Sequence, residues 1–254
     1  ASLGGKAGLL SVTGDDEAAN ALDALMAQDG VDSYLMRDKQ IATTVKLRVV
    51  ARNQQLIRLD FEEHPNREVL EQIKQKYREI LPEYDAIIFS DYGKGGLSHI
   101  SDMIDWAKHA GKTVLIDPKG DDYEKYAGAT LITPNRAELK EVVGSWKNES
   151  ELTEKAQNLR RHLDLTAVLL TRSEEGMTLF SEGEPIYQPT RAQEVYDVSG
   201  AGDTVIAGVG LGLAAGYTMP EAMHLANTAA GVVVAKLGTA VCSFVELNKA
   251  LEEQ

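Results

Sequence analysis

The chain lacks several features that would place it in familiar classes of protein. Its 254 residues include one cysteine, Cys242, so an intrachain disulfide is impossible and a reducing cytoplasm is the expected location. No apolar run is long enough to span a membrane, and no basic-then-apolar leader follows Ala1. We therefore expect neither a membrane anchor nor a secretion signal. The five histidines show no paired metal-ligand spacing, so the sequence suggests no zinc site.

Positive charge is also scarce. The chain has 26 lysines and arginines against 39 aspartates and glutamates, for a net charge of −13, and no basic run interrupts this excess. Repulsion from phosphates then opposes tight nucleic-acid binding, so we expect no nucleic-acid partner. An anionic ligand would need cations that are arranged locally.

Apolar runs typical of strands alternate with amphipathic helical patterns along most of the chain. The strands are expected at residues 7–12, 85–91, 112–117, 129–133 and 166–171, and the helices at 15–28, 67–81, 100–110 and 150–163. Three more helices are expected to begin near Gly202, Pro220 and Ser243. This order predicts an α/β fold whose mainly parallel β-sheet has helices on both faces. Without a repeat or linker, residues 1–254 are expected to form a single domain.

Residues 43–61 break this pattern. Val45, Leu47 and Val49 alternate with polar residues, and after "RNQ" a second run alternates Ile57, Leu59 and Phe61 with Arg58 and Asp60. The pattern predicts a β-hairpin with one apolar face and one face that carries cations. An isolated hairpin is marginal in water, so its apolar face must pack on something, for example a second subunit. An ordinary exposed sheet is the alternative, although its place outside the alternating core favours a lid.

Two glycine patterns resemble nucleotide-binding motifs and fail on inspection. "AGKTV" resembles the end of a P-loop, but the leading glycine position is Trp106 and a helix precedes it where a strand is required. "GVGLGLAAG" has Leu213 at the third glycine position of the dinucleotide fingerprint. Glycine is a poor helix former, so we expect Gly208, Gly210 and Gly212 to let a buried helix approach its neighbours closely.

The stretch "SGAGD" is a stronger candidate for catalysis. Gly200, Ala201 and Gly202 can turn sharply, and the helix that follows presents unpaired amides, which attract anions. Such amides would stabilise the charge on a transferring phosphoryl group. Asp203 in the first turn could then accept the proton of an attacking hydroxyl. An aspartate at a helix start is usually a cap, but the combination with a small-residue loop and a buried small-residue helix favours the catalytic interpretation.

"TPNRAELKEVVG" has two interpretations that can both hold. Asn135 and Glu138 match a helix capping box, and the residues alone favour capping. Alternatively, Glu138 faces nucleotide phosphates and holds Mg²⁺ through water, since hard cations prefer oxygen ligands.

Three further loops follow strands. "TRSEEG" at 171–176 is either a nucleotide-contacting loop or a plain turn, and the turn is favoured. "SDYGKGG" and "IDPKG" put four charged residues at the carboxyl ends of expected strands, where open α/β sheets bind ligands: Asp91, Lys94, Asp117 and Lys119. For each of these residues, a solvated loop position is an equal alternative.

With these motifs in order, the sequence resembles the ribokinase-like family of carbohydrate kinases. "DVSGAGD" matches the family's D-x-x-G-A-G-D, and "TPNRAE" matches its N-x-x-E. Further stretches are similar to members that phosphorylate D-glycero-β-D-manno-heptose 7-phosphate at O1, on the route to ADP-heptose for lipopolysaccharide. They are "VKLRVVARNQQLIRLDFEE", "SDYGKG", "IDPKG", "LLTRSEEGM", "AQEVYDVSGAGDTVI" and "AAGVVVAKLGT".

The resemblance implies an ATP-dependent, magnesium-dependent sugar kinase with these site residues. Asp203 would be the base, with the amides of Gly200, Ala201 and Gly202 as the anion hole. The nucleotide and magnesium site would comprise Asn135, Arg136, Ala137, Glu138, Thr171, Ser173, Gly176 and Asn227, although the family commonly has glycine at the Ser173 position. Asp197 and Ser199 fall where relatives hold a monovalent cation such as K⁺. The sugar phosphate would contact Lys46, Arg48, Arg58, Asp91 and Lys94, with the hairpin as a lid and as the contact of a homodimer.

The family pattern also differs from this chain in extent. Its first strand with a sugar-binding acid, a hairpin and a G-G-A-x-N-x-A helix would precede "ASLGGKAG", so we expect part of the sugar-contacting half to lie outside this sequence. The chain stops at Gln254, as a single-function form would. Three alternatives stay open: a kinase for another sugar or sugar phosphate, a nucleotide-binding but inactive relative, and a Rossmann-type oxidoreductase, which the failed glycine fingerprint disfavours.

Overall fold

The chain folds as two units that take alternate parts of the sequence. The structure is a computed structural model, and it describes residues 1–51, 54–191 and 195–253. One unit consists of Ala1, Gly5–Ile80 and Gly93–His99; the other consists of Ser2–Gly4, Leu81–Tyr92 and Ile100–Gln254. They are called unit 1 and unit 2 below. A single kinase domain over residues 1–254 stays a prediction.

Unit 1 begins with a parallel strand–helix–strand arrangement. Strand β1 (Ala7–Gly14) pairs with β2 (Val31–Asp38), and helix α1 (Glu17–Gln28) connects them. Asp16 caps this helix, because its side chain accepts a hydrogen bond from the Ala19 amide. Helix α2 (Arg67–Ile80) packs on both strands. It buries the side chains that recur at helical spacing: Val69, Ile73, Tyr77 and Ile80.

The expected hairpin is confirmed as β3 (Val45–Ala51) and β4 (Gln54–Phe61). Its pairs Val45–Phe61, Leu47–Leu59 and Val49–Ile57 share one face, and the polar pairs lie between them. All six apolar side chains are 39% to 55% exposed in this chain. The expected "RNQ" turn falls on residues 52–54, of which 52 and 53 lie outside the described residues.

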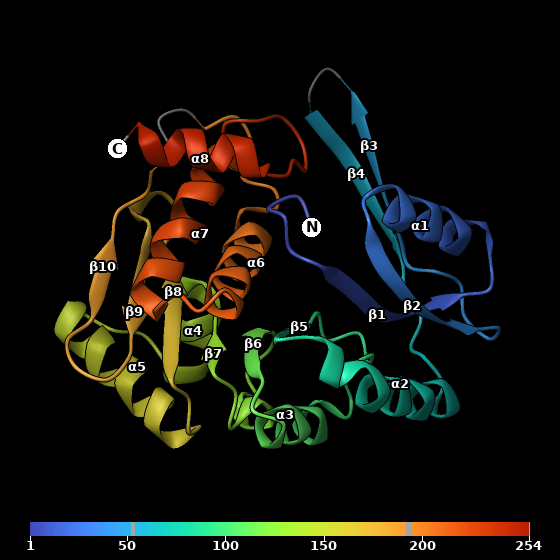
Figure 1. Cartoon of the computed structure of the whole chain (residues 1–254), viewed down its shortest axis with the longest axis horizontal. Helices are drawn as coiled ribbons and strands as arrows, with labels where there is room; N and C mark the ends of the chain where they lie inside the picture. Colours follow the sequence, from blue (N-terminus) through green and yellow to red (C-terminus); the bar gives the residue numbers. More distant parts are fainter. Residues whose placement is uncertain (52–53, 192–194, 254) are drawn as a thin grey trace. The chain divides into compact units, whose positions relative to one another are not determined.

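Unit 2 is built on a six-stranded sheet of order β10-β9-β8-β7-β6-β5 (Figure 1). The strands are β5 (Ala86–Ser90), β6 (Thr113–Asp117), β7 (Leu131–Ile132), β8 (Ala167–Thr171), β9 (Met177–Phe180) and β10 (Ile186–Gln188). Neighbours from β5 to β8 are parallel, while β9 and β10 are antiparallel additions. The mainly parallel sheet is therefore confirmed, and its carboxyl ends form one edge.

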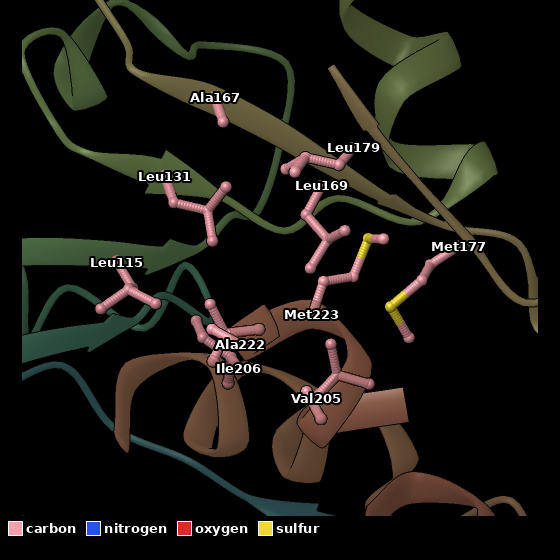
Figure 2. Packing of buried hydrophobic residues seen from close by; sticks show 12 residues of the cluster. Leu115, Leu131, Ala167, Leu169, Met177, Leu179, Val205, Ile206, Ala222 and Met223 are labelled. Atoms are coloured by element: carbon pink, nitrogen blue, oxygen red, sulfur yellow. The ribbon is translucent and has the colours of Figure 1, made fainter. Parts of the chain in front are cut away.

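Helices cover the sheet of unit 2. They are α3 (Ile100–His109), α4 (Arg136–Val143), α5 (Glu149–His162), α6 (Ala201–Ala214) and α7 (Met219–Val234), while α8 (Phe244–Glu252) packs on α7. Short 3₁₀ turns lie at Leu81–Glu83, Glu124–Tyr126 and Ser173–Glu175. Figure 2 shows Val205, Ile206, Ala222 and Met223 of α6 and α7 meeting the strand side chains in one buried cluster. Among the described residues, no helix combines the length and the apolar character needed to cross a bilayer.

The glycine stripe of α6 has the predicted packing role. A Cβ atom on Gly208 would lie 3.1 Å from the Ala226 Cβ, and one on Gly212 would lie 2.9 Å from the Ala222 Cβ. Either side chain would push α6 away from α7. These glycines therefore serve helix packing in the core and not a dinucleotide.

Candidate active site

The glycine turn and Asp203 stand at the N-terminus of α6. Gly200 caps the helix with φ of 79°, in the left-handed region that favours glycine. The Ala201 amide donates to the Val198 carbonyl at 3.2 Å, so this part of the expected anion hole is engaged in a turn. The amides of Gly200 and Gly202 have no acceptor among the described residues. With the Asp203 amide, which likewise has no acceptor among the described residues, these N–H groups are available donors for an anion at this helix end.

Asp203 is exposed and does not turn into the protein interior. Its Oδ1 accepts a long hydrogen bond of 3.5 Å from the hydroxyl of Tyr92, which follows strand β5. Its Oδ2 faces the turn, 4.0 Å from the place a Cβ on Gly200 would take. The carboxylate is therefore presented beside the glycine amides.

Asp197 braces the same turn. Its carboxylate accepts the Ser199 amide at 2.9 Å and the Gly238 amide at 3.1 Å, which joins the turn to the α7–α8 connection. These bonds, led by the Ser199 amide, lower the pKa of Asp197. Each carboxylate oxygen has a second lone pair, so Asp197 can still serve a cation. With Ser199, the expected K⁺ site stays a prediction.

A concentration of negative charge lies at the carboxyl edge of the sheet. Burial, followed by the charges of Glu138 and Asp203, raises the pKa of Asp117 to about 6. Asp117 ends β6, Glu138 stands in the first turn of α4, and Asp203 in the first turn of α6. Lys119 compensates part of this charge, because its Nζ lies 3.2 Å from Glu138 Oε1.

The capping interpretation of "TPNRAE" is confirmed. The Asn135 side chain accepts from the amides of Ala137 and Glu138, at 2.9 Å and 3.0 Å, and Glu138 Oε2 accepts the Asn135 amide at 2.9 Å. Capping uses one oxygen of Glu138 and leaves the other beside Lys119. A metal role for Glu138 is therefore compatible with the cap.

The carboxylate oxygens at this edge are suitable ligands for a magnesium ion, although they do not form a preassembled binding site. Within residues 1–51, 54–191 and 195–253, no three His, Cys, Asp or Glu side chains lie close enough to bind a metal. Burial is the main cause of the raised pKa of Asp117, and the negative charges of Glu138 and Asp203, which add to it, are ones that a divalent cation would neutralise. Mg²⁺ commonly binds through one or two carboxylates together with water and substrate phosphates.

The loop 171–176 is held in one conformation. An isolated bridge joins Thr171 to Asn135, which brings these two predicted nucleotide residues to one edge. Ser173 has φ of 53°, so this serine adopts the left-handed conformation that suits the glycine common in the family. Gly176 has φ of 102°, and a Cβ there would lie 2.2 Å from the Gln188 carbonyl oxygen.

Two arginines fix this loop through Glu175. Arg136 binds Glu175 with both guanidinium nitrogens, one at 2.7 Å. Arg172, only 6% exposed, binds Glu175 at 2.9 Å and Glu149 at 2.6 Å. The Arg136 charge is thus already neutralised by an acid of the loop, so Arg136 connects α4 to the loop.

Two residues of the predicted site are engaged elsewhere within unit 2. Asn227 is 3% exposed, and its amide donates to the Pro189 carbonyl at 2.7 Å. Asp91 is 8% exposed and accepts hydrogen bonds from Lys125 and the Tyr126 hydroxyl, both at 2.7 Å. In this structure each side chain stabilises the fold around the site, and a direct contact of either with a ligand stays a prediction.

The predicted phosphate-binding cations lie in unit 1. Glu62 lies between Lys46, at 3.5 Å, and Lys94, which it contacts directly. Arg58 pairs with Asp60 at 3.0 Å. Arg48 lies opposite Arg58 in the hairpin register, so two like charges face each other across the strands.

Sequence reasoning gave no role to Tyr92, and it named Asp117 at the ligand-binding edge without assigning it to the site. Both lie in motifs that the sequence marks, "SDYGKGG" and "IDPKG". Tyr92 lies two residues beyond β5, at the ligand-binding edge where β6 ends at Asp117, and this position is the signal that could have given it a role.

The comparisons with known proteins identify the class. Residues 1–245 match the pfkB family of carbohydrate kinases, and the chain belongs to this family. The expected ribokinase-like fold is confirmed. Phosphofructokinase-2 of Escherichia coli in complex with potassium covers 99% of this chain and 83% of its own length, with 19% identity and a TM-score of 0.83. Arabidopsis thaliana ribokinase complexed with ribose and ATP has the same coverage, with 20% identity and a TM-score of 0.83.

Relatives of higher identity narrow the resemblance. The chain is 52% identical to the bifunctional protein HldE of Chromohalobacter salexigens, over 99% of this chain and 53% of that protein. It is 48% identical to the D-beta-D-heptose 7-phosphate kinase of Bordetella bronchiseptica, over 97% of this chain and 79% of that protein. The chain thus spans about half the length of several curated relatives that it matches.

Proposed function

We propose that the chain is a kinase that transfers the γ-phosphoryl group of ATP to O1 of D-glycero-β-D-manno-heptose 7-phosphate. The observation that carries this proposal is the 48% identity, over 97% of this chain, to a relative named as a heptose 7-phosphate kinase. The exposed carboxylate of Asp203 beside two available amides supports it independently. The product would be the 1,7-bisphosphate, on the route to ADP-heptose and lipopolysaccharide.

Asp203 acts as the general base in this proposal. It accepts the proton of the sugar hydroxyl while the oxygen of that hydroxyl attacks the γ-phosphorus, and the bond to the β-phosphate oxygen breaks. The amides of Gly200 and Gly202 stabilise the charge on the migrating group, because N–H groups that have no acceptor in the described part of the chain can donate to its oxygens. The Ala201 amide contributes only if it leaves the Val198 carbonyl, so we assign it the smaller share.

The nucleotide is proposed to bind at the edge formed by α4 and the loop 171–176. Asn135, Thr171, Ser173 and Gly176 present backbone and side-chain groups there, while Glu138 holds Mg²⁺ through water. A magnesium ion held there would supply positive charge that neutralises part of the phosphate charge. Asp197 and Ser199 are proposed to hold K⁺; their bonds to the turn that carries Gly200 support this assignment.

The cations of the hairpin face are proposed to bind the 7-phosphate of the sugar. Arg48 is the strongest candidate, because it faces the like charge of Arg58 and an anion between them relieves this repulsion, whereas Arg58 already pairs with Asp60. Lys46 and Lys94 are partly neutralised by Glu62. The six exposed apolar side chains on the other hairpin face support a homodimer through this face, since such a strip is unfavourable in water. The single cysteine supports a cytoplasmic location.

The test is a coupled assay of ADP release with a panel of sugars. Heptose 7-phosphate, the unphosphorylated heptose, fructose 6-phosphate and ribose are offered to the chain with Mg-ATP. We expect heptose 7-phosphate to give the highest kcat/KM by at least about tenfold. A higher kcat/KM for another sugar would identify that sugar as the substrate and refute the heptose assignment. ATP binding without any sugar-dependent ADP release would reject kinase activity of this chain.

A further inference from the structure

The hydroxyl of Tyr92 contacts the proposed base. It lies 3.5 Å from Asp203 Oδ1, and the two residues are 111 positions apart in the chain. Tyr92 directly follows Asp91, whose amide donates to the Asp117 carbonyl at 3.0 Å and whose buried side chain binds Lys125. The backbone before Tyr92 is therefore anchored to β6 and to the interior of unit 2.

The two oxygens of Asp203 have different surroundings. Oδ1 faces the Tyr92 hydroxyl, while Oδ2 faces the turn at Gly200, where the available amides lie. A carboxylate torsion is broad and roughly two-fold, so an exposed aspartate would otherwise rotate freely between equivalent arrangements. A donor on one oxygen removes that freedom and leaves the other oxygen toward the anion hole.

The surroundings of Tyr92 make its hydroxyl a donor. Burial, followed by the charges of Asp203 on α6 and Asp117 on β6, raises the pKa of Tyr92, so the phenol stays protonated at neutral pH. A protonated phenol beside a carboxylate donates to it.

We propose that Tyr92 is a positioning residue for the reaction, whose hydroxyl holds the Asp203 carboxylate so that Oδ2 faces the acceptor hydroxyl. The inference rests on the proposed function, in which Asp203 is the base. It assigns a role to the aromatic residue of "SDYGKGG".

A titration by NMR tests the contact without any turnover. The full chain is labelled at tyrosine Cζ, and Tyr92→Phe identifies the Tyr92 resonance. We expect the Tyr92 pKa to fall in Asp203→Asn, because the negative charge and the charged acceptor are lost together. Asp121→Asn, an exposed acid outside the site, is the matched control and should leave the Tyr92 titration unchanged. An unchanged Tyr92 pKa in Asp203→Asn would overturn the inference, whether or not the chain phosphorylates a sugar.

Kinetics then separate this inference from the proposed function. Tyr92→Phe should lower kcat about tenfold and leave KM for ATP within about twofold, because only the orientation of the base is lost. Tyr217→Phe, which removes the hydroxyl of a similarly exposed tyrosine (49% against 52%), should behave as wild type. A wild-type kcat in Tyr92→Phe alongside an inactive Asp203→Asn would reject Tyr92 and keep the base. An active Asp203→Asn would reject the base, and the inference with it.

Discussion

The carbonyl oxygen of Gln188 lies 2.2 Å from the position that a Cβ atom on Gly176 would occupy. Gly176 also has a positive φ of 102°, so two independent constraints exclude a side chain there. Gly176→Ala should lower the free energy of unfolding by about 3 kcal/mol or more, and it should weaken ATP binding by displacing the loop 171–176. Urea unfolding and ATP titration measure both effects.

Gly183→Ala is the matched control for that change. Gly183 has φ of 94°, but no atom lies within 4 Å of the place that its Cβ would take, so only the backbone conformation opposes the substitution. It should cost about 1 kcal/mol. Equal costs at the two positions would show that the contact with Gln188 carries no energy.

Replacing the proposed base should stop the reaction while leaving nucleotide binding. Asp203→Asn keeps the shape of the side chain but cannot accept the hydroxyl proton, so kcat should fall by about 10²–10⁴-fold. ATP affinity, measured by calorimetry, should stay within a few fold. Turnover close to that of the wild type would refute the role of Asp203.

The facing arginines of the hairpin should discriminate substrates by their phosphate. Arg48→Ala should raise KM for a phosphorylated sugar more than for its unphosphorylated analogue, and by more than Lys46→Ala, since Lys46 is partly neutralised by Glu62. Without substrate, Arg48→Ala should not destabilise unit 1, because it relieves a like-charge pair worth about 0.2–1 kcal/mol. Arg67→Ala on α2 is the control. If Arg48→Ala raised KM equally for both sugars, the proposed phosphate contact would be refuted.

The raised pKa of Asp117 predicts a pH-dependent stability. The pKa of Asp117 is about 6 in the folded chain, above the 3.8 that is ordinary for an aspartate, so the folded state binds the proton more tightly. The resulting stabilisation is complete below about pH 4 and is lost as the pH rises through about 6. Asp117→Asn has no carboxyl group to titrate, so it does not lose this stabilisation. The unfolding free energy of the variant minus that of the wild type should therefore rise by about 2 kcal/mol as the pH is raised from about 4 to about 7.5. Urea unfolding at a series of pH values measures the difference.

Asp197→Asn should show the opposite sign. The pKa of Asp197 is lowered by backbone hydrogen bonds, so its contribution is present above pH 3.8 and disappears as the pH falls. The variant should therefore be less stable than wild type at neutral pH, and the difference should shrink in acid. If the stability difference from wild type changed with pH in the same direction for both variants, the raised pKa of Asp117 and the lowered pKa of Asp197 could not both hold.

The ion pairs of Glu175 should stabilise the loop 171–176, where we propose that ATP binds. Glu175→Gln removes the charged partner of Arg136 and one partner of the buried Arg172, which still keeps Glu149. We expect a loss of about 1–2 kcal/mol in unfolding free energy and a several-fold rise in KM for ATP. Glu174→Gln, at the exposed neighbour, is the control; if it matches Glu175→Gln, the network has no special role.

The parts of the fold with strong local signals were predictable from sequence. Parallel strands, the hairpin register and the cap at Asn135 follow from alternation and from short-range hydrogen bonding. Strands β9 and β10 were not predicted, because four and three residues are too few for alternation to be recognised. Strand β2 was also missed; its sequence "VDSYLMRD" mixes polar and apolar residues without a regular period.

The site divides in the same way. Gly200, Asp203 and Glu138 lie in compact motifs, so their grouping at helix starts could be predicted. The buried pairing of Asp91 with Lys125 could not, because it joins residues 34 positions apart through tertiary packing. The contact of Tyr92 with Asp203 and the shared use of Glu175 by Arg136 and Arg172 have the same origin.

The bond between Asp197 and the Gly238 amide has a consequence for how this enzyme family can vary. Because the glycine turn is joined to the α7–α8 connection, inserting or deleting residues around position 238 would shift the turn at Gly200 and, with it, the proposed base Asp203. Surface loops usually tolerate changes in length, but the length of this one is constrained by its hydrogen bond to Asp197, 41 positions earlier in the chain.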